Sequence, residues 1–196
     1  DEPRGGSGTV KSPLGPLAPL GGRRFERIAN VLFLGEAAST NEVARAVVER
    51  MVAEETDVLP TCIVADRQTA GKGRYGRTWV TAGEGALAVS LLAPWPEGPE
   101  RIHVPVAVGI SLARSLSHAF GVELRLKWPN DLLAGRRKIA GILVEGRTLA
   151  DGAGYVVVGL GLNVGATRSD LDVLGLPFAT SLALEGAAPA VLKGDA

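Results

Sequence analysis

The chain has 196 residues, of which 46% are hydrophobic, and its 21 Lys and Arg balance its 21 Asp and Glu to a formal net charge of zero. This length suits one domain with a substantial hydrophobic core, and the charge balance gives no general argument for binding nucleic acid or an acidic membrane. No apolar run approaches the roughly 18–20 residues of a membrane span. The single cysteine, Cys62, excludes an intrachain disulfide and favours a reduced, cytoplasmic setting.

Residues 1–24 are rich in Gly and Pro and show no apolar period. We expect a disordered tail there, followed by one folded domain over residues 25–196. A signal peptide is not expected, because the first residues lack its basic and apolar regions.

Short apolar runs predict strands at Val31–Glu36, Pro60–Asp66 and Ala86–Leu92. After the first run, Ser39 and Glu42 fit the S-x-x-E capping box ahead of an apolar stripe typical of a helix. Either Ser39 serves only as a helix cap, or the hydroxyl and amide side chains at this helix start also hydrogen-bond a neutral polar ligand.

The stretch Arg67–Trp79, RQTAGKGRYGRTW, places Gly71, Gly73 and Gly76 among four cations. Glycine allows close backbone approach to a ligand, and clustered cations repel one another unless an anion lies among them. The pattern predicts a loop that closes over an anionic ligand, with a solvated basic turn as the alternative. It nearly matches the G-x-G-x-x-G dinucleotide-binding motif and the P-loop, but both of these nucleotide motifs need a helix immediately afterwards. Trp79–Gly85 lacks a helical stripe, so we reject both.

Apolar residues at helical spacing predict a helix over His103–Phe120, ended by Gly121. We expect its histidines, His103 and His118, to be surface residues and not metal ligands. Their distance along the chain from Cys62 also weakens the case for a cysteine nucleophile.

The segment Leu124–Asp131, LRLKWPND, predicts a strand ending in a turn, because Pro129 favours extended backbone before it and Asn-Asp favours a turn. That turn presents Lys127, Asn130 and Asp131. A tight turn over 134–136 then leads into a further strand at Lys138–Glu145, which predicts a β-hairpin.

Three glycines interrupt apolar strands: Gly141 in Lys138–Glu145, and Gly159 and Gly161 in Tyr155–Val164. Because glycine weakens a strand, they indicate either a floor for a flat ligand or a pair of bulges. A short helix is expected near 181–184. Strands interrupted by two helices predict an α+β fold, with a mixed or mostly antiparallel sheet and flanking helices.

Five motifs occur in a recognisable order: STN at 39–41, GKGRYGRTW at 71–79, KWPND at 127–131, KIAGILVEG at 138–146 and VVVGLGLNV at 156–164. Together they resemble the catalytic domain of biotin protein ligases (biotin–acetyl-CoA-carboxylase ligases) over roughly residues 35–184. The resemblance implies that biotin and ATP give biotinyl-5′-AMP and pyrophosphate. Biotin then passes to a lysine of a biotin carboxyl carrier protein. It also implies Mg²⁺, and no nucleic-acid or membrane partner.

The resemblance further implies residue roles. Ser39, Thr40 and Gln68 would hydrogen-bond the ureido head of biotin, while Trp79 would stack on adenine and Asn163 would read its edge. The full set of expected ligand-binding residues is Ser39, Thr40, Asn41, Gln68, Gly71, Lys72, Gly73, Arg74, Trp79, Asn130, Asp131, Lys138, Gly141, Gly159 and Asn163.

For the reacting groups, the resemblance makes Lys72, Arg74 and Lys138 the catalytic residues. Lys72 and Arg74, with Gly73 between them, would wrap the carboxylate and phosphate, and Lys138 would bridge both. Asn130 and Asp131 would lie near the phosphates, with Asp131 as a Mg²⁺ ligand. Lys72 stands where many members have arginine, which keeps the charge but loses the bidentate fork.

Two alternatives remain at this point. Lipoate–protein ligases share the fold and the acyl-adenylate chemistry, and a non-catalytic biotin or biotinyl-AMP binder would use the same residues. Neither the N-terminal DNA-binding domain of regulatory members nor the usual C-terminal barrel is recognisable, so transcriptional repression is not expected.

Overall fold

The computed structural model describes residues 27–80, 85–95, 102–149, 152 and 154–187. The tail predicted at 1–24 lies outside these residues. Within them, no helix is both long and apolar enough to cross a membrane. The described residues form nine strands: β1 (Asn30–Ala37), β2 (Thr61–Gln68), β3 (Gly71–Lys72), β4 (Thr78–Trp79), β5 (Ala86–Pro94), β6 (Leu124–Lys127), β7 (Asp131–Ala134), β8 (Arg137–Thr148) and β9 (Gly154–Asn163).

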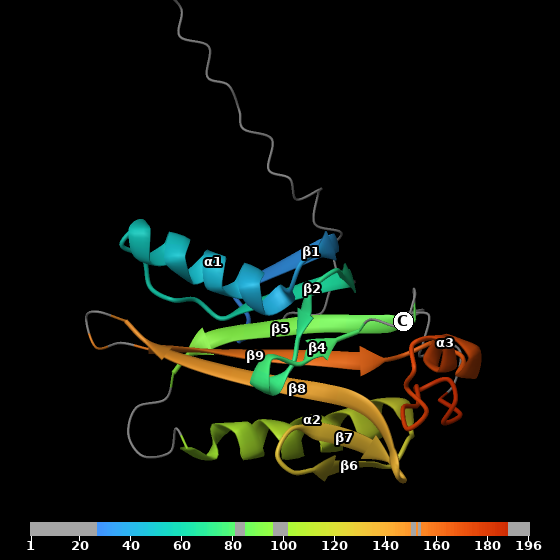
Figure 1. The fold of residues 1–196 in the computed structure, drawn as a ribbon. Coiled ribbons are helices and arrows are strands. Elements are labelled where there is room, and N and C mark those ends of the chain that lie inside the picture. Colours follow the sequence, from blue (N-terminus) through green and yellow to red (C-terminus); the bar gives the residue numbers. More distant parts are fainter. Residues whose placement is uncertain (1–26, 81–84, 96–101, 150–151, 153, 188–196) are drawn as a thin grey trace, which may run out of the picture.

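Seven of these strands form one sheet in the order β1-β2-β5-β9-β8-β7-β6 (Figure 1). β1 and β2 are parallel, and every other neighbouring pair in this sheet is antiparallel. The short strands β3 and β4 pair separately, with a 3₁₀ turn at Arg74–Gly76 between them. The expected mixed, mostly antiparallel sheet is confirmed.

In the part of the chain that the structure describes, three helices accompany the sheet: α1 (Thr40–Ala53), α2 (Val104–Phe120) and α3 (Arg168–Val173). α2 ends where predicted, with Gly121 in the left-handed region at φ 67°. The prediction of a short helix near 181–184 is wrong, because that segment forms turns. The sequence reading also missed α3, although Thr167 and Asp170 form a reciprocal capping box at its start.

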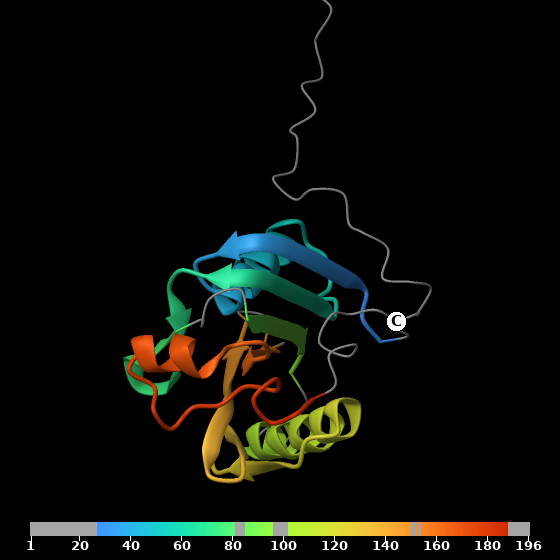
Figure 2. The same ribbon diagram turned by 90° about the vertical axis from the view of Figure 1, so that its right-hand side faces the viewer.

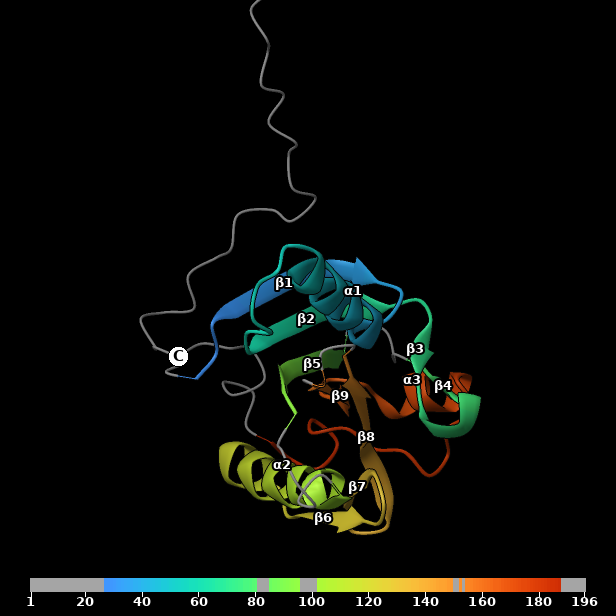
Figure 3. The same cartoon turned by 90° about the vertical axis from the view of Figure 1, so that its left-hand side faces the viewer.

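The helices α1 and α2 pack on opposite faces of the sheet, since successive strand residues point to opposite sides. On β9, Tyr155 and Val157 join the core under α1, whereas Val156 and Val158 join the core with α2. Figure 3 shows the two helices separated by β5, β9 and β8. After α3 the chain returns to the α2 side (Figure 2), where Leu182 is fully buried.

The start of α1 differs from the prediction. Ser39 is the N-cap residue, but its side chain makes no capping hydrogen bond and is 2% exposed. Glu42 instead pairs with Lys72 and lies 3.8 Å from Arg45. The predicted capping box is therefore wrong, because the Glu42 side chain interacts instead with Lys72 of the basic loop (residues 67–79) and with Arg45 in the next turn of the helix.

Candidate active site

A cavity of about 390 Å³ opens on the α1 face of the sheet, between the start of α1 and the β6–β7 turn. Segments far apart in the sequence meet there: the first turn of α1, the end of β2, the basic loop, β8 and β9. The predicted residues that line it are Ser39, Thr40, Asn41, Gln68, Lys72, Gly73, Arg74, Trp79, Asn130, Asp131, Lys138, Gly141 and Gly159.

Glycines on the α1 face of the sheet make this cavity possible. Beyond Tyr155 and Val157, the next β9 residues on the same face are Gly159 and Gly161. A Cβ at Gly159 would overlap the Asn41 amide, so its absence lets the start of α1 approach the sheet. The core under α1 thus gives way to an open polar space.

Gly161 and its cross-strand partner Gly141 lie beneath the indole of Trp79. A Cβ at Gly161 would stand 2.5 Å from the indole Nε1, and one at Gly141 would stand 3.0 Å from Cζ3. Pairing between β8 and β9 is regular here, so the bulge alternative is wrong. The glycines do form a floor for a flat group, but the indole of Trp79 occupies it.

Gly71 does not line this cavity but an adjoining, more open one of about 590 Å³. It pairs with Trp79 across β3 and β4, and a Cβ there would stand 2.5 Å from the Trp79 carbonyl oxygen. Its role in this structure is to let β4 approach β3.

The wall of the cavity formed by Thr40, Asn41 and Gln68 is polar and uncharged, and Lys72, which pairs with Glu42 of α1, borders it. Thr40 and Asn41 are each 3% exposed, and the Thr40 N–H donates to Gln68 Oε1 at 2.7 Å. Such groups suit a neutral ligand head with several hydrogen-bonding atoms.

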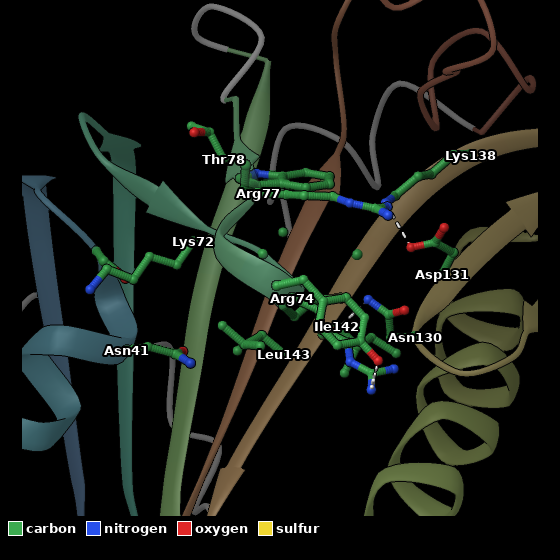
Figure 4. A pocket seen from close by; sticks show the side chains of 18 of the residues that line it. Asn41, Lys72, Arg74, Arg77, Thr78, Asn130, Asp131, Lys138, Ile142 and Leu143 are labelled. Atoms are coloured by element: carbon green, nitrogen blue, oxygen red, sulfur yellow. Dashed lines mark hydrogen bonds and ion pairs between the residues drawn. The ribbon is translucent and has the colours of Figure 1, made fainter.

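The opposite end of the cavity is cationic. Lys138 Nζ lies 2.6 Å from Asp131 Oδ1 (Figure 4). The same ammonium group lies 5.6 Å from the Trp79 ring centroid. Among the described lining residues, the only acidic side chain is Asp131, and the basic ones are Lys72, Arg74, Arg77, Lys127 and Lys138. This excess of positive charge attracts an anionic ligand into the cavity.

The basic loop reverses direction through two left-handed residues, Tyr75 at φ 58° and Gly76 at φ 72°. The Arg74 guanidinium lies over the Tyr75 ring, 5.0 Å from its centroid. The loop leads into β4 and not into a helix, so the rejection of both nucleotide motifs is confirmed. At the loop's start, a charge-assisted hydrogen bond from Lys72 lowers the pKa of Glu42.

Several other expectations can be located. The buried Asn163 side chain does not line the cavity but donates to the Thr180 carbonyl oxygen at 3.0 Å. Cys62 lies in β2 away from the cavity, and burial raises the pKa of its thiol. His103 and His118 are exposed, as predicted.

A metal role for Asp131 stays a prediction. In the described ranges, no group of three or more His, Cys, Asp or Glu side chains could hold a metal ion.

The sequence reading assigned no site role to several residues that line the cavity. The loop residues Tyr75, Arg77 and Thr78 continue the recognised basic motif, and Trp128 and Pro129 belong to the KWPND turn. Because these residues lie within named motifs, the sequence could have predicted that they line the cavity. Ile142, Leu143 and Leu160 also lie within named motifs, but they read as ordinary apolar strand residues.

Comparison with known proteins decides the family. The model of the Biotin/lipoate A/B protein ligase family matches residues 38–163. The chain belongs to this family. That range contains every predicted site residue.

Two curated relatives illustrate the match. The Bifunctional ligase/repressor BirA of Bacillus subtilis is 32% identical over 123 residues, which is 62% of this chain and 38% of that protein. The Biotin--[acetyl-CoA-carboxylase] ligase of Mycobacterium tuberculosis is 34% identical over 162 residues, which is 76% of this chain and 53% of that protein. The matches thus span about half or less of each relative's length.

Solved structures agree with the fold. Biotin protein ligase from Aquifex aeolicus, in complex with biotin and ATP, is 31% identical with a TM-score of 0.59, covering 85% of this chain and 68% of that one. A putative lipoate protein ligase from T. acidophilum gives a TM-score of 0.57 at 13% identity, covering 85% and 81% of the two chains. At that identity the second match shows the fold alone.

Proposed function

We propose that this domain catalyses ATP-dependent biotinylation. It joins biotin to ATP as biotinyl-5′-AMP, releasing pyrophosphate, and transfers biotin to a lysine of a biotin carboxyl carrier protein. Family membership supports this, as do the Mycobacterium tuberculosis relative named as a biotin ligase and the Aquifex aeolicus ligase that binds biotin and ATP. A cytoplasmic location, where carboxylases and ATP meet, is part of the proposal.

The observation that carries the proposal is the two-ended character of one cavity. Its uncharged polar end, at Thr40 and Gln68, suits the ureido head of biotin, and its cationic end suits a carboxylate and a triphosphate. A ligand that spans the cavity places its anionic tail among the cations, and that is where adenylation must occur.

The first step brings two anions together. A carboxylate oxygen of biotin attacks the α-phosphorus of ATP, a new P–O bond forms, and the bond to the bridging oxygen breaks as pyrophosphate leaves. Two like charges ~4 Å apart repel by about 4 kcal/mol at an effective dielectric near 20. Lys72, Arg74 and Lys138 offset this repulsion and hold the reacting atoms in line.

Lys138 enters this step already oriented. Its ammonium group is held between Asp131 and the indole of Trp79, so it is positioned before ligand binds. A group that needs little reorganisation stabilises transition-state charge more effectively than a mobile one. Trp79 in turn offers its free face to the adenine.

Magnesium would arrive with the nucleotide. Mg²⁺ is commonly bound by one or two carboxylates together with substrate phosphates. Asp131 fits this role as a single carboxylate beside Asn130, although it would share its charge with Lys138. When bound, the ion neutralises phosphate charge.

In the second step, the neutral amine of the acceptor lysine attacks the carbonyl carbon of the mixed anhydride. An amide forms and AMP leaves. No enzyme nucleophile is required, in agreement with the position of Cys62 and the raised pKa of its thiol.

Exchange of radiolabelled pyrophosphate into ATP, measured with biotin or with lipoate, tests the first step. Biotin-dependent exchange, followed by biotin transfer to an isolated carrier domain, is expected. Exchange that prefers lipoate would assign the lipoate ligase reaction instead. Biotin binding without exchange or transfer would leave only a biotin-binding domain.

A further inference from the structure

A chain of hydrogen bonds runs behind the uncharged end of the cavity. The Asn41 Nδ2 donates to Glu145 Oε2 at 2.7 Å, and Asn41 Oδ1 lies 2.6 Å from Ser90 Oγ. Ser90 Oγ lies 2.8 Å from Thr40 Oγ1, which lies 3.2 Å from Gln68 Oε1. These side chains come from α1, β2, β5 and β8, and Ser90 is fully buried.

Strand register places this chain on the α1 face. Ser90 lies across from Gly159, and Glu145 lies across from Val157, whose side chain packs under α1. Because Gly159 has no side chain, the Asn41 amide fits between Ser90 and Glu145. Arg45 Nη1 donates to the other oxygen of Glu145 at 3.2 Å and so holds the carboxylate toward α1.

Counting protons gives this chain a direction. An ionised carboxylate only accepts, so the Asn41 amide must turn its NH₂ to Glu145 and its oxygen to Ser90. An amide oxygen also only accepts, so the Ser90 hydroxyl must donate its one proton to Asn41 Oδ1. The short contact between Ser90 and Thr40 must then be a donation from Thr40.

The Thr40 hydroxyl therefore has no proton left for the cavity. Gln68 Oε1 accepts a hydrogen bond from the Thr40 backbone N–H, so the Gln68 amide turns its oxygen, and not its NH₂ group, toward Thr40. Two acceptor oxygens thus lie 3.2 Å apart at the wall of the cavity, and neither can donate to the other. Such a pair is satisfied by a ligand N–H placed beside it.

We propose that Glu145 is a positioning residue that determines ligand specificity. By fixing the Asn41 amide, its carboxylate makes Thr40 an obligatory hydrogen-bond acceptor, so the site selects a ligand head that carries an N–H. The proposal rests on the proposed function, in which that N–H belongs to the ureido ring of biotin. A dithiolane ring, as in lipoate, has no such donor.

The test compares biotin with its two cyclic carbamate analogues, in which one or the other ureido N–H is replaced by a ring oxygen. This change swaps a donor for an acceptor with little change in shape. Calorimetric titration gives Kd for each ligand in the wild-type chain, Glu145→Ala and Ser90→Ala. The quantity of interest is the ratio of Kd between biotin and the more weakly bound carbamate.

In the wild type, facing acceptors should weaken that carbamate by roughly 10- to 100-fold. Glu145→Ala frees the Asn41 amide to turn over, so Ser90 can donate to Thr40 and Thr40 can donate to the ligand. Ser90→Ala frees Thr40 directly and leaves the bond between Glu145 and Asn41 intact. In both variants we expect the ratio to fall by about tenfold or more.

Glu54→Ala is the matched control, since it removes an exposed carboxylate at the other end of α1 that, among the residues the structure describes, pairs with Arg50 alone. Its ratio should equal that of the wild type. If Glu145→Ala and Ser90→Ala weaken biotin and carbamate equally, Glu145 has a structural role only and the proposal is overturned. If Glu145→Ala does not fold, Glu145→Gln replaces it, because a glutamine amide can donate to Asn41 as well as accept from it, so the Asn41 amide is again free to turn over and the ratio should fall. A wild-type chain that binds no biotin would instead overturn the proposed function, and this inference with it.

Discussion

Replacing Gly161 by alanine should disable the nucleotide end of the cavity while leaving the biotin end intact. The new Cβ would stand 2.5 Å from Nε1 and 2.7 Å from Cζ2 of Trp79. Non-bonded carbon atoms pack at about 3.5–4.0 Å. The indole must therefore withdraw from the β9 surface by roughly 1 Å, because a strand backbone paired on both sides cannot yield as easily.

The size of the effect follows from that displacement. A misplacement of about 1 Å in a positioning group can cost about 100-fold in rate, equivalent to roughly 2.7 kcal/mol of transition-state stabilisation. Trp79 is the proposed support for adenine and also lies beside Lys138. We expect kcat/KM for ATP in pyrophosphate exchange to fall by about two orders of magnitude. The Kd for biotin should stay within about threefold, since Thr40 and Gln68 lie at the other end of the cavity.

Gly146→Ala provides a matched control. Its Cβ would stand 2.5 Å from Cη2 of Trp95, a comparable clash with a tryptophan, but on the α2 face of the sheet and outside the cavity. Both variants should lose thermal stability, but only Gly161→Ala should show the fall in kcat/KM for ATP. Equal losses for ATP and biotin in Gly161→Ala, or wild-type ATP kinetics, would refute the reasoning.

Three further predictions concern Lys138, Cys62 and the loop over residues 71–77. Lys138→Ala should lower kcat for adenylation by roughly 100- to 1,000-fold with little change in biotin affinity; a kcat within a few-fold of wild type would make Lys138 an ordinary surface lysine. Cys62→Ser should keep both half-reactions, and because burial raises the pKa of the Cys62 thiol, iodoacetamide at neutral pH should label it more slowly than free cysteine; rapid labelling or lost activity would contradict this. Tryptic cleavage after Arg74 or Arg77 should slow when biotinyl-AMP is bound, because its phosphate pairs with the loop cations; equal cleavage rates would show that the ligand does not order the loop.

Much of the fold was readable from the sequence because its signals are local. Apolar runs located the long strands, Gly121 marked the end of α2, and the tight turn at 134–136 predicted the β-hairpin that leads into β8. Strand periodicity and turn chemistry depend on neighbouring residues, so they survive without knowledge of the rest of the chain. The short helix α3 was missed because six residues give too little periodicity.

The candidate site was predictable in composition but less so in arrangement. The motifs named most of the residues that line the cavity. They did not show that Trp79 covers Gly141 and Gly161, or that the Asn163 side chain turns away toward Thr180. Ser39 likewise matched a capping motif whose glutamate found another partner.

The sequence by itself determined the long strands, the two long helices, the main turns, and which residue types gather around an anionic ligand. Only the tertiary structure decided which polar atoms meet. Asn41 reaches Glu145 across 104 residues and Ser90 across 49, and both contacts depend on sheet register and on the space left by Gly159. A local pattern specifies burial and backbone conformation, whereas a hydrogen-bond partner is set by the segments that long-range strand pairing brings together.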